Sequence, residues 1–453
     1  MTGHLQEHLE QPGVGVDVGD VADAVAHHHE HLEEVARGQL RRDGVAVDGD
    51  EVGGDEVGGD DVERRQPGQE LVGVEHPAGL RAVAPVEVGV GPSQRPTERG
   101  AELVGTGPGV DLQEQAGLHH GHGANGTVDP VSDRRWIVIG AGAIGGTVGG
   151  RLHQGGAEVV LVARGAHGEA LRDGGLLLRD PDGDARLDIP TVAHPAEVAW
   201  RDGDVALLAT KTQQATAALD DLVAAGPDAP VVCLTNGVDA ERQALRRLPQ
   251  VHGMCVMLPA THLEPGVVEV SSAPCSGVLD IGLATGGSDD VDDDLAAALR
   301  AGAFVADPTP TVLRRKRAKL LLNLVNVLDA ACGPDPGLGP IAERAQEEGR
   351  LAMAAAGLDW STPEEDAARR GDHIRMRRVD GKRRGGGSTW QSLARGRGDT
   401  EADYLNGEVV LLGRLHGVPT PVNAGLQRLA RHLASTGAAP GSMTVGDVEP
   451  WLG

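Results

Sequence analysis

Residues 136–145 read Trp-Ile-Val-Ile-Gly-Ala-Gly-Ala-Ile-Gly. The first four residues form an uninterrupted apolar run, which is typical of a buried strand. In the pattern Gly140-x-Gly142-x-x-Gly145, the first glycine allows a tight turn, the second lets a pyrophosphate approach the backbone, and the third lets helix and strand pack closely. We therefore predict a strand, a phosphate-binding turn and a helix whose N-terminus faces the phosphates of a dinucleotide.

The surroundings of the glycine pattern support this interpretation. A second apolar run, residues 159–163, follows after about one helix of chain, so the pattern lies inside a unit of βαβ length. Glycine is abundant here, with 67 among 453 residues, and a glycine-rich surface turn is the less favoured alternative. We include Ala143 and Ile144, which lie between the second and third glycines, in the predicted cofactor site.

The residue after the second apolar run bears on the choice of cofactor. An NAD site carries Asp or Glu about 20 residues after the glycine pattern, where the carboxylate accepts from the ribose 2′-hydroxyl. This chain has Arg164 directly after the run, and a guanidinium suits a 2′-phosphate. The sequence thus favours NADPH over NADH, with an ordinary solvated arginine as the alternative.

Two further apolar runs, residues 204–210 and 230–234, are each followed by polar residues. Lys211 comes directly after the first run, and Asn236 comes shortly after the second. Ligands of open α/β sheets bind at the carboxyl ends of parallel strands, so these positions are candidate ligand contacts. Lys211 is one of only four lysines among 41 basic residues, which suggests a need for a compact, titratable ammonium.

Residues 316–331 predict a buried helix, because from Lys319 to Val327 every residue is Leu or Val apart from Lys319, Asn323 and Asn326. Spacings of four and three residues place these polar side chains on one helical face. Such a stripe requires polar partners or a ligand cavity. We favour a substrate cavity over a polar layer between packed helices.

The C-terminal part offers one further candidate. Residues 385–390 are a glycine-rich loop, and residues 400–407 open a helix that Gly417 and the prolines after it end. We expect Glu401 in the first turn of that helix, where the macrodipole favours a carboxylate. By itself Glu401 is more commonly explained as an ordinary helix-start acid.

The composition excludes several classes of protein. A net charge of −26 argues against nucleic-acid binding, and the four cysteines lack the spacing of a zinc ribbon or a disulfide framework. Neither an apolar stretch long enough to span a membrane nor a secretory signal is visible. We expect a cytoplasmic protein with no metal and with no membrane or nucleic-acid partner.

Residues 1–133 differ from the rest of the chain. They contain 26 Asp and Glu, 8 Arg, and no Lys, Ile, Phe, Tyr, Trp or Cys, which predicts a disordered low-complexity extension. The cluster at residues 27–31 offers four histidines to a metal, although adventitious binding is the stronger interpretation. An acidic interaction tail is a further alternative. Our preferred hypothesis is that the segment is a mis-assigned start and that the protein begins near Val128 or Val131.

Taken together, residues 135–435 resemble the ketopantoate reductase (2-dehydropantoate 2-reductase) family. The pieces that carry the resemblance are Gly140-x-Gly142-Ala143-Ile144-Gly145, Ala163-Arg164-Gly165, Thr210-Lys211-x-x-Gln214, Asn236-Gly237-Val238, Lys319-Leu320-x-x-Asn323, Thr400-Glu401-x-Asp403-x-x-Asn406-Gly407 and Gly417-Val418-Pro419-Thr420-Pro421-x-Asn423. The resemblance implies an α/β Rossmann-type domain at 135–305, an all-α domain at 306–453, and an active site in the cleft between them. It also implies a role in pantothenate biosynthesis and allows a homodimer.

The resemblance further implies roles for single residues. Lys211, Gln214 and Asn236 would line the nicotinamide side of the cofactor site. Lys319 would donate a proton to the ketone oxygen of a 2-keto acid as NADPH reduces it, and Glu401 would accept from the resulting hydroxyl. Asn323 and Asn326 would orient the substrate, and Ser388 would hold its carboxylate.

Two positions depart from the family pattern, both on the substrate side. Val327 stands where the family has its second helix asparagine, with Asn326 one residue earlier, and Ser392 stands where the family has aspartate. The leading hypothesis is NADPH-dependent reduction of 2-dehydropantoate to pantoate. The alternatives are a paralogous reductase of another small keto acid and a non-catalytic NADP-binding sensor or partner protein.

Overall fold

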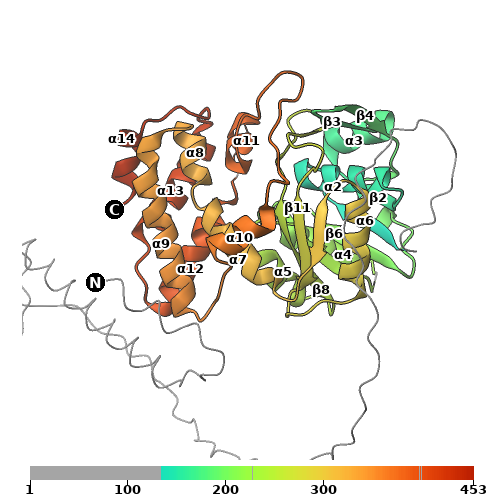
Figure 1. Cartoon of the computed structure of the whole chain (residues 1–453), viewed down its shortest axis with the longest axis horizontal. Helices are drawn as coiled ribbons and strands as arrows, with labels where there is room; N and C mark the ends of the chain where they lie inside the picture. Colours follow the sequence, from blue (N-terminus) through green and yellow to red (C-terminus); the bar gives the residue numbers. More distant parts are fainter. Residues whose placement is uncertain (1–133, 227, 397, 399) are drawn as a thin grey trace, which may run out of the picture. The chain divides into compact units, whose positions relative to one another are not determined.

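The computed structural model describes residues 134–226, 228–396, 398 and 400–453. All of these belong to one compact unit of the chain. The predictions for residues 1–133, namely disorder, the histidine cluster and the mis-assigned start, lie outside the described residues. Within the unit, a mixed α/β domain is followed by a helical domain, as the sequence predicted (Figure 1).

The larger sheet of the described part has eight strands and contains the predicted apolar runs. In spatial order they are β12 (Val305–Pro308), β11 (Val278–Leu283), β8 (Val251–Met257), β7 (Val231–Cys233), β6 (Asp204–Leu208), β1 (Arg135–Ile139), β2 (Glu158–Val162) and β5 (Thr191–Val192). Neighbouring strands are parallel except β8 and β11, which pair antiparallel, so the sheet is mixed. The predicted domain boundary at residues 305/306 falls within β12.

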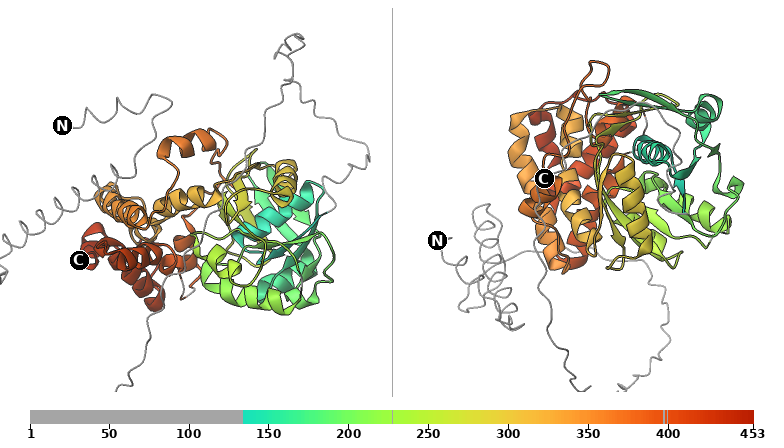
Figure 2. Two further views of the ribbon diagram at one scale, coloured as in Figure 1. Left: turned by 90° about the horizontal axis from the view of Figure 1, so that it is seen from below. Right: turned by 45° about the vertical axis from the view of Figure 1, so that its right-hand side comes forward.

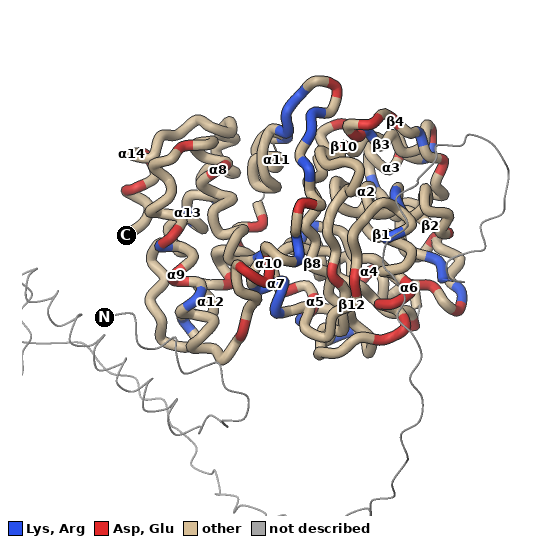
Figure 3. The backbone as a smooth tube through the Cα atoms, viewed as in Figure 1, with Lys and Arg blue, Asp and Glu red and all other residues tan. Residues whose placement is uncertain are grey.

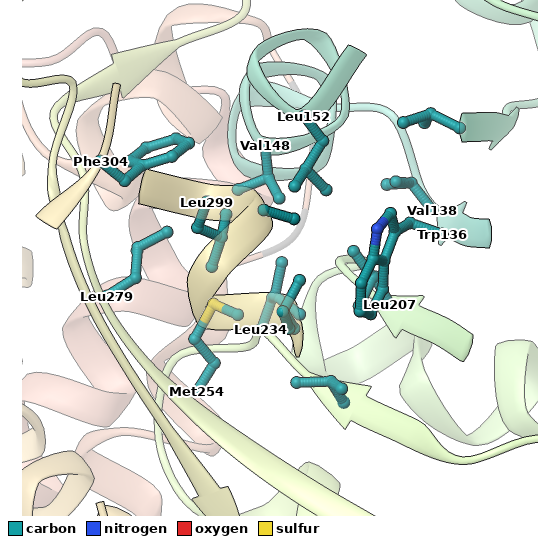
Figure 4. Packing of buried hydrophobic residues seen from close by; sticks show 14 of the residues in the cluster. Trp136, Val138, Val148, Leu152, Leu207, Leu234, Met254, Leu279, Leu299 and Phe304 are labelled. Atoms are coloured by element: carbon teal, nitrogen blue, oxygen red, sulfur yellow. The ribbon is translucent and has the colours of Figure 1, made fainter. Parts of the chain in front are cut away.

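Alternating side chains of β1 pack on opposite faces of this sheet. Trp136 and Val138 contribute to one apolar core with helices α2 and α6, part of which Figure 4 shows, whereas Ile137 and Ile139 join the core beneath α4 and α5. Helices therefore cover both faces, which explains why residues 136–139 of β1 are all apolar. The helices of this domain are α2 (Ala143–Gln154), α3 (Gly165–Gly174), α4 (Thr212–Ala224), α5 (Asp239–Leu245), α6 (Asp290–Ala301) and the 3₁₀ turn η1 (Pro195–Glu197).

A second, smaller sheet was not predicted. It consists of β4 (Gly183–Leu187), β3 (Leu176–Asp180), β10 (Val267–Val270) and β9 (Ala260–Thr261), in this spatial order. Its buried side chains Leu176, Leu178 and Val268 join the core around α2. This sheet thus extends the α/β domain beside the predicted phosphate-binding helix.

The helical domain packs around its own apolar core, which includes Leu324, Val409 and Leu426. Figure 2 shows its helices gathered beside the α/β domain in both views. Its elements are α7 (Val312–Asn323), α8 (Asn326–Cys332), η2 (Pro336–Leu338), α9 (Gly339–Ala355), α10 (Pro363–Arg370), α11 (Ser388–Ala394), η3 (Glu401–Asp403), α12 (Asn406–His416), α13 (Pro421–Thr436), α14 (Val445–Val448) and η4 (Glu449–Trp451). No helix in the described ranges is long and apolar enough to cross a membrane.

Two predictions about helices were wrong. Residues 316–331 are not one buried helix, because α7 ends at Asn323, α8 starts at Asn326, and Leu322 is 45% exposed. Glu401 is not in the first turn of α12 but in the separate turn η3, and the acidic residue in the first turn of α12 is Glu408.

A buried polar network stabilises the break between α7 and α8. Nδ2 of Asn406 donates to the carbonyl of Leu324 and to Oδ1 of Asn423, each over 3.0 Å. Asn423 in turn donates to the carbonyl of Ala345 and to Glu348 over 2.8 Å. A carbonyl left without a partner by the end of a helix is thereby satisfied, because these buried amides reach it. Asn406 and Asn423 therefore support the site without lining it.

Candidate active site

A cavity of about 620 Å³ opens at the carboxyl ends of β1, β6, β7 and β8 and is closed on its other side by segments of the helical domain. All of the predicted site residues except Gly145 line it. These are Gly140, Gly142, Ala143, Ile144, Arg164, Lys211, Gln214, Asn236, Lys319, Asn323, Asn326, Ser388 and Glu401. The structure thus brings residues that are up to 261 positions apart in the sequence to one cavity.

The three glycines of the turn meet three different steric demands. Gly140 has φ +97°, a conformation that side chains rarely adopt, and a Cβ there would lie 3.0 Å from the backbone of Thr210. A Cβ on Gly145 would lie 2.0 Å from the carbonyl oxygen of Gly140, so this glycine serves the packing of α2 on β1. A Cβ on Gly142 would meet no atom within 4 Å, because this residue borders the cavity.

The first turn of α2 faces the same cavity through Ala143 and Ile144. Gly142 occupies the N-cap and provides no side-chain cap, so the N–H groups of the first turn remain for a ligand. An open approach to Gly142 together with a helix N-terminus is the arrangement that binds a pyrophosphate.

Arg164 follows β2 and caps α3 at the rim of the cavity, with a side chain that is 68% exposed. Its guanidinium lies 3.8 Å from the carboxylate of Asp221, which in turn lies 3.4 Å from Nε2 of His194. Asp221, on α4, and His194, which precedes η1, both line the cavity, and neither was predicted from the sequence. Arg164, His194 and Asp221 thus form a cluster of one guanidinium, one imidazole and one carboxylate beyond the end of β2.

Lys319 projects from α7 into the cavity and contacts the end of β7. Its Nζ donates to Oδ1 of Asn236 over 2.8 Å and to the carbonyl of Val256. Burial lowers the pKa of Lys319 from 10.5 to about 8, the positive charge of Lys316 acts in the same direction, and Glu401 opposes the shift. An amine of this kind exchanges protons near neutral pH.

Lys316 lies one turn before Lys319 and belongs to the wall behind the site. It is 3% exposed, and its Nζ lies 2.5 Å from Oε1 of Glu241 and 2.8 Å from the carbonyl of Thr235. The ion pair joins α7 to α5, and the bond to Thr235 joins α7 to the segment after β7, next to Asn236. The rarity of lysine in the chain could have drawn attention to Lys316 as it did to Lys211.

Glu401 is 8% exposed and reaches the cavity from η3. Its Oε1 accepts from the backbone N–H and the hydroxyl of Thr212, at 3.3 and 3.2 Å, so the start of α4 fixes its position. Nearby, Nζ of Lys211 donates to Oγ of Ser392 over 2.6 Å, and that hydroxyl donates to the carbonyl of Ser388 over 3.1 Å. Ser392, at a position that departs from the family pattern, is thus a hydrogen-bond partner of Lys211.

Asn323 and Asn326 lie on either side of the break between α7 and α8, and both still line the cavity. Nδ2 of Asn323 is buried without a hydrogen-bond partner, so it can donate to a ligand. Val327 is 1% exposed and belongs to the core of the helical domain. The asparagine that faces the cavity in this part of α8 is thus Asn326.

Residues 360–395 contribute a wall of the cavity that, apart from Ser388, was not predicted from the sequence. Arg370, Ile374 and Arg384, from a stretch that is dense in charged residues, line the cavity together with Gln391 and Arg395. Nε2 of Gln391 donates to the carbonyl of Ala260 over 3.1 Å, which attaches α11 to the smaller sheet. Residues on charged loops give no periodic signal, so their burial depends on tertiary packing.

Comparisons with known proteins agree with this arrangement. The family model described as ketopantoate reductase PanE/ApbA matches residues 136–285, and the model of its C-terminal part matches residues 314–434. These matches, together with a glycine turn and the buried amine of Lys319 in one cavity, identify an oxidoreductase that uses a nicotinamide cofactor. The chain belongs to the ketopantoate reductase family.

Curated relatives match along nearly their whole length. The 2-dehydropantoate 2-reductase of Pyrococcus horikoshii is 26% identical over 309 residues, which cover 66% of this chain and 97% of the relative. That of Halobacterium salinarum is 29% identical over 315 residues, covering 66% of this chain and 98% of the relative. The matched length corresponds to the described domains.

Solved structures share the fold. A PanE/ApbA family ketopantoate reductase from Ralstonia eutropha JMP134 has a TM-score of 0.57 and 27% identity, covering 67% of this chain and 99% of that one. D-mandelate dehydrogenase, solved with NADH and anilino(oxo)acetate, has a TM-score of 0.56 at 22% identity, with 67% and 99% covered. The second likeness concerns the fold alone.

Proposed function

We propose that the protein reduces a 2-keto acid to a 2-hydroxy acid with NADPH, and that 2-dehydropantoate is the first candidate substrate. The observation that carries the proposal is the position of Lys319, whose amine shares one cavity with the glycine turn at Gly142. The names of the two archaeal relatives support the choice of substrate.

The residues present fit a dinucleotide cofactor. The space before Gly142 and the first turn of α2 would hold the pyrophosphate, and Arg164 would hold a 2′-phosphate, which favours NADPH over NADH. Lys211, Gln214 and Asn236 would lie on the nicotinamide side. When bound, the reduced nicotinamide supplies the hydride that the carbonyl carbon takes up.

Lys319 acts on the oxygen of the same carbonyl. Reduction builds negative charge on that oxygen, and a positioned ammonium both stabilises the charge and donates the proton that completes the hydroxyl. Asn236 and the carbonyl of Val256 hold the amine in place, so it approaches the substrate in a fixed direction. A pKa of about 8 leaves the amine largely protonated at neutral pH yet able to release its proton.

The remaining polar residues position the substrate. Asn323 offers an unpartnered Nδ2 to it, and Asn326 lines the cavity one turn further along the chain. Ser388 would contact the carboxylate, and Glu401, fixed by Thr212, would accept from the hydroxyl that forms. Together these contacts orient the carbonyl toward the nicotinamide side of the cavity.

A different small keto acid is the second candidate substrate. Ser392, which contacts Lys211, stands where the family has aspartate. The loss of that negative charge beside the substrate favours a different keto acid. A sensor without catalysis is disfavoured, since nucleotide binding alone requires neither Lys319 nor Glu401 in the cavity.

One assay separates these functions. The full chain is incubated with NADPH or NADH and a panel of 2-keto acids that includes ketopantoate, while absorbance at the nicotinamide band is followed. Consumption with ketopantoate alone supports the first substrate, and consumption with another acid supports the second. Tight NADPH binding without consumption by any acid would contradict catalysis.

The proposal includes a cytoplasmic location and a homodimer as predictions. Cell fractionation tests the location, and sedimentation of the purified chain tests the oligomeric state. A stable monomer that is fully active would exclude a need for the dimer.

A further inference from the structure

The loop between α10 and α11, residues 371–387, is dense in arginine and lysine. Figure 3 shows these basic positions concentrated where the loop rises beside α11. The side chains of Arg378 and Arg383 are exposed, whereas Arg384 is half-buried and lines the cavity. Arg384 thus differs from its neighbours on the loop, because it carries its charge into the active site.

The surroundings of Arg384 leave donors without protein acceptors. Its Nε is buried and has no hydrogen-bond partner, and Nη2 lies 3.5 Å from the carbonyl of Ala260, which Gln391 already contacts at 3.1 Å. Burial lowers the pKa of the Arg384 guanidinium, and the negative charge of Asp329 only opposes this effect. A desolvated cation with spare donors is costly unless an anion binds it.

The position of Arg384 selects the kind of anion. A guanidinium presents two parallel N–H groups that match the two oxygens of a carboxylate. Ser388 and Gln391, on the segment that follows, line the same cavity, as do Lys319 and Asn323. A 2-keto acid whose carbonyl oxygen faces Lys319 therefore has a cation available for its carboxylate within the same enclosure.

We propose that Arg384 binds the carboxylate of the substrate through a paired, two-hydrogen-bond contact, with Ser388 contributing beside it. The inference rests on the proposed function, because it assumes a keto acid in the cavity. It assigns to the Arg-rich loop the recognition of the acid group, while α7 supplies the groups that act on the carbonyl.

The test compares Arg384→Gln and Arg384→Lys with Arg383→Gln, which removes an adjacent exposed charge that does not line the cavity. We expect Arg384→Gln to raise the KM for the keto acid by roughly 10- to 100-fold, since a hydrogen-bonded charge pair is lost. The KM for NADPH and the Tm should stay at wild-type values. The KM of Arg384→Lys for the keto acid should lie between those of the wild type and Arg384→Gln, because an ammonium keeps the charge but not the two parallel N–H groups of a guanidinium.

Two results would overturn the proposal. An unchanged KM for the keto acid in Arg384→Gln would mean that the residue does not contact the substrate. A parallel loss of NADPH affinity and Tm would show instead that Arg384 stabilises the loop.

Binding of oxamate, an unreactive analogue of a 2-keto acid, separates this inference from the proposed function. If the wild-type protein turns over no keto acid, the proposed function fails, and calorimetry with the NADP⁺-loaded protein then decides the role of Arg384. At least tenfold weaker oxamate binding by Arg384→Gln, with wild-type binding by Arg383→Gln, would support it. Equal binding by all three proteins, or none by the wild type, would refute it.

Discussion

Nζ of Lys319 donates a hydrogen bond over 2.8 Å to Oδ1 of Asn236. This bond joins α7 to the loop that follows β7. The amine is therefore positioned by both parts of the molecule. One turn away, Lys316 joins α7 to Glu241 of α5 and to the carbonyl of Thr235, which also follows β7. The proposed catalytic amine of Lys319 therefore depends on the docking of α7 against the sheet.

Replacement of Lys319 by alanine is expected to reduce kcat by roughly 10²- to 10⁴-fold, the usual contribution of a general acid. NADPH binding, followed by fluorescence titration, should be retained because the glycine turn is untouched. Lys382→Ala serves as the control, since Lys382 is exposed and does not line the cavity. Equal losses of turnover and NADPH affinity would indicate that Lys319 is structural.

The pH dependence follows from the pKa of Lys319, which is lowered to about 8. Reduction of the keto acid requires the protonated amine, so kcat/KM for reduction should fall as pH rises through about 8. Oxidation of the hydroxy acid requires the neutral amine and should rise over the same range. Steady-state rates in both directions between pH 6 and 10 test this, and parallel profiles for the two directions would contradict it.

Arg164→Ala is expected to raise the KM for NADPH by roughly tenfold or more, because a charge-assisted contact to the 2′-phosphate is lost. The KM for NADH, which lacks that phosphate, should change little. Arg186→Ala is the matched control, since Arg186 is exposed and donates to the carbonyl of Gly174 away from the cavity. A similar rise in the KM for NADPH and for NADH would show that Arg164 does not determine the preference between the two cofactors.

Alanine at Gly142 and at Gly145 should have different consequences. Gly145→Ala places a methyl group 2.0 Å from the carbonyl oxygen of Gly140, and we expect it to lower the free energy of unfolding by about 3 kcal/mol. Gly142→Ala meets no protein atom within 4 Å, so it should fold normally but bind NADPH more weakly. Urea denaturation and NADPH titration distinguish the two, and equal destabilisation would show that both glycines serve packing.

The cofactor side of the site could be predicted from the sequence because its requirements are local. The conformations of Gly140 and Gly145 and the strand before them are specified within ten residues. Lys319 and Asn323 could likewise be found, since polar residues in an apolar helix stand out. The family resemblance added Ser388, which no periodic pattern would have marked, and gave a proposed role to Glu401, which the sequence alone offered only as an acid at a helix start.

The break after α7 and the role of Arg384 could not be predicted in this way. No glycine or proline interrupts residues 316–331, and the helix ends where Asn406, from a distant segment, binds the carbonyl of Leu324. Arg384 belongs to a run of basic residues that reads as a solvated loop. Its guanidinium instead reaches the carbonyl of Ala260, which Gln391 also contacts, and this is a contact of the tertiary structure.

Hydrogen bonds cross between the sheet and the helical domain at several points around the cavity. The bridging pairs are Lys211 with Ser392, Thr212 with Glu401, and Asn236 with Lys319. Exchange of the nucleotide-binding half for that of a homologue, as in a chimera built to accept another cofactor, would therefore also exchange the anchors of the residues that we propose act on the substrate. Such a hybrid would need positions 211, 212 and 236 transplanted back to keep its catalytic geometry.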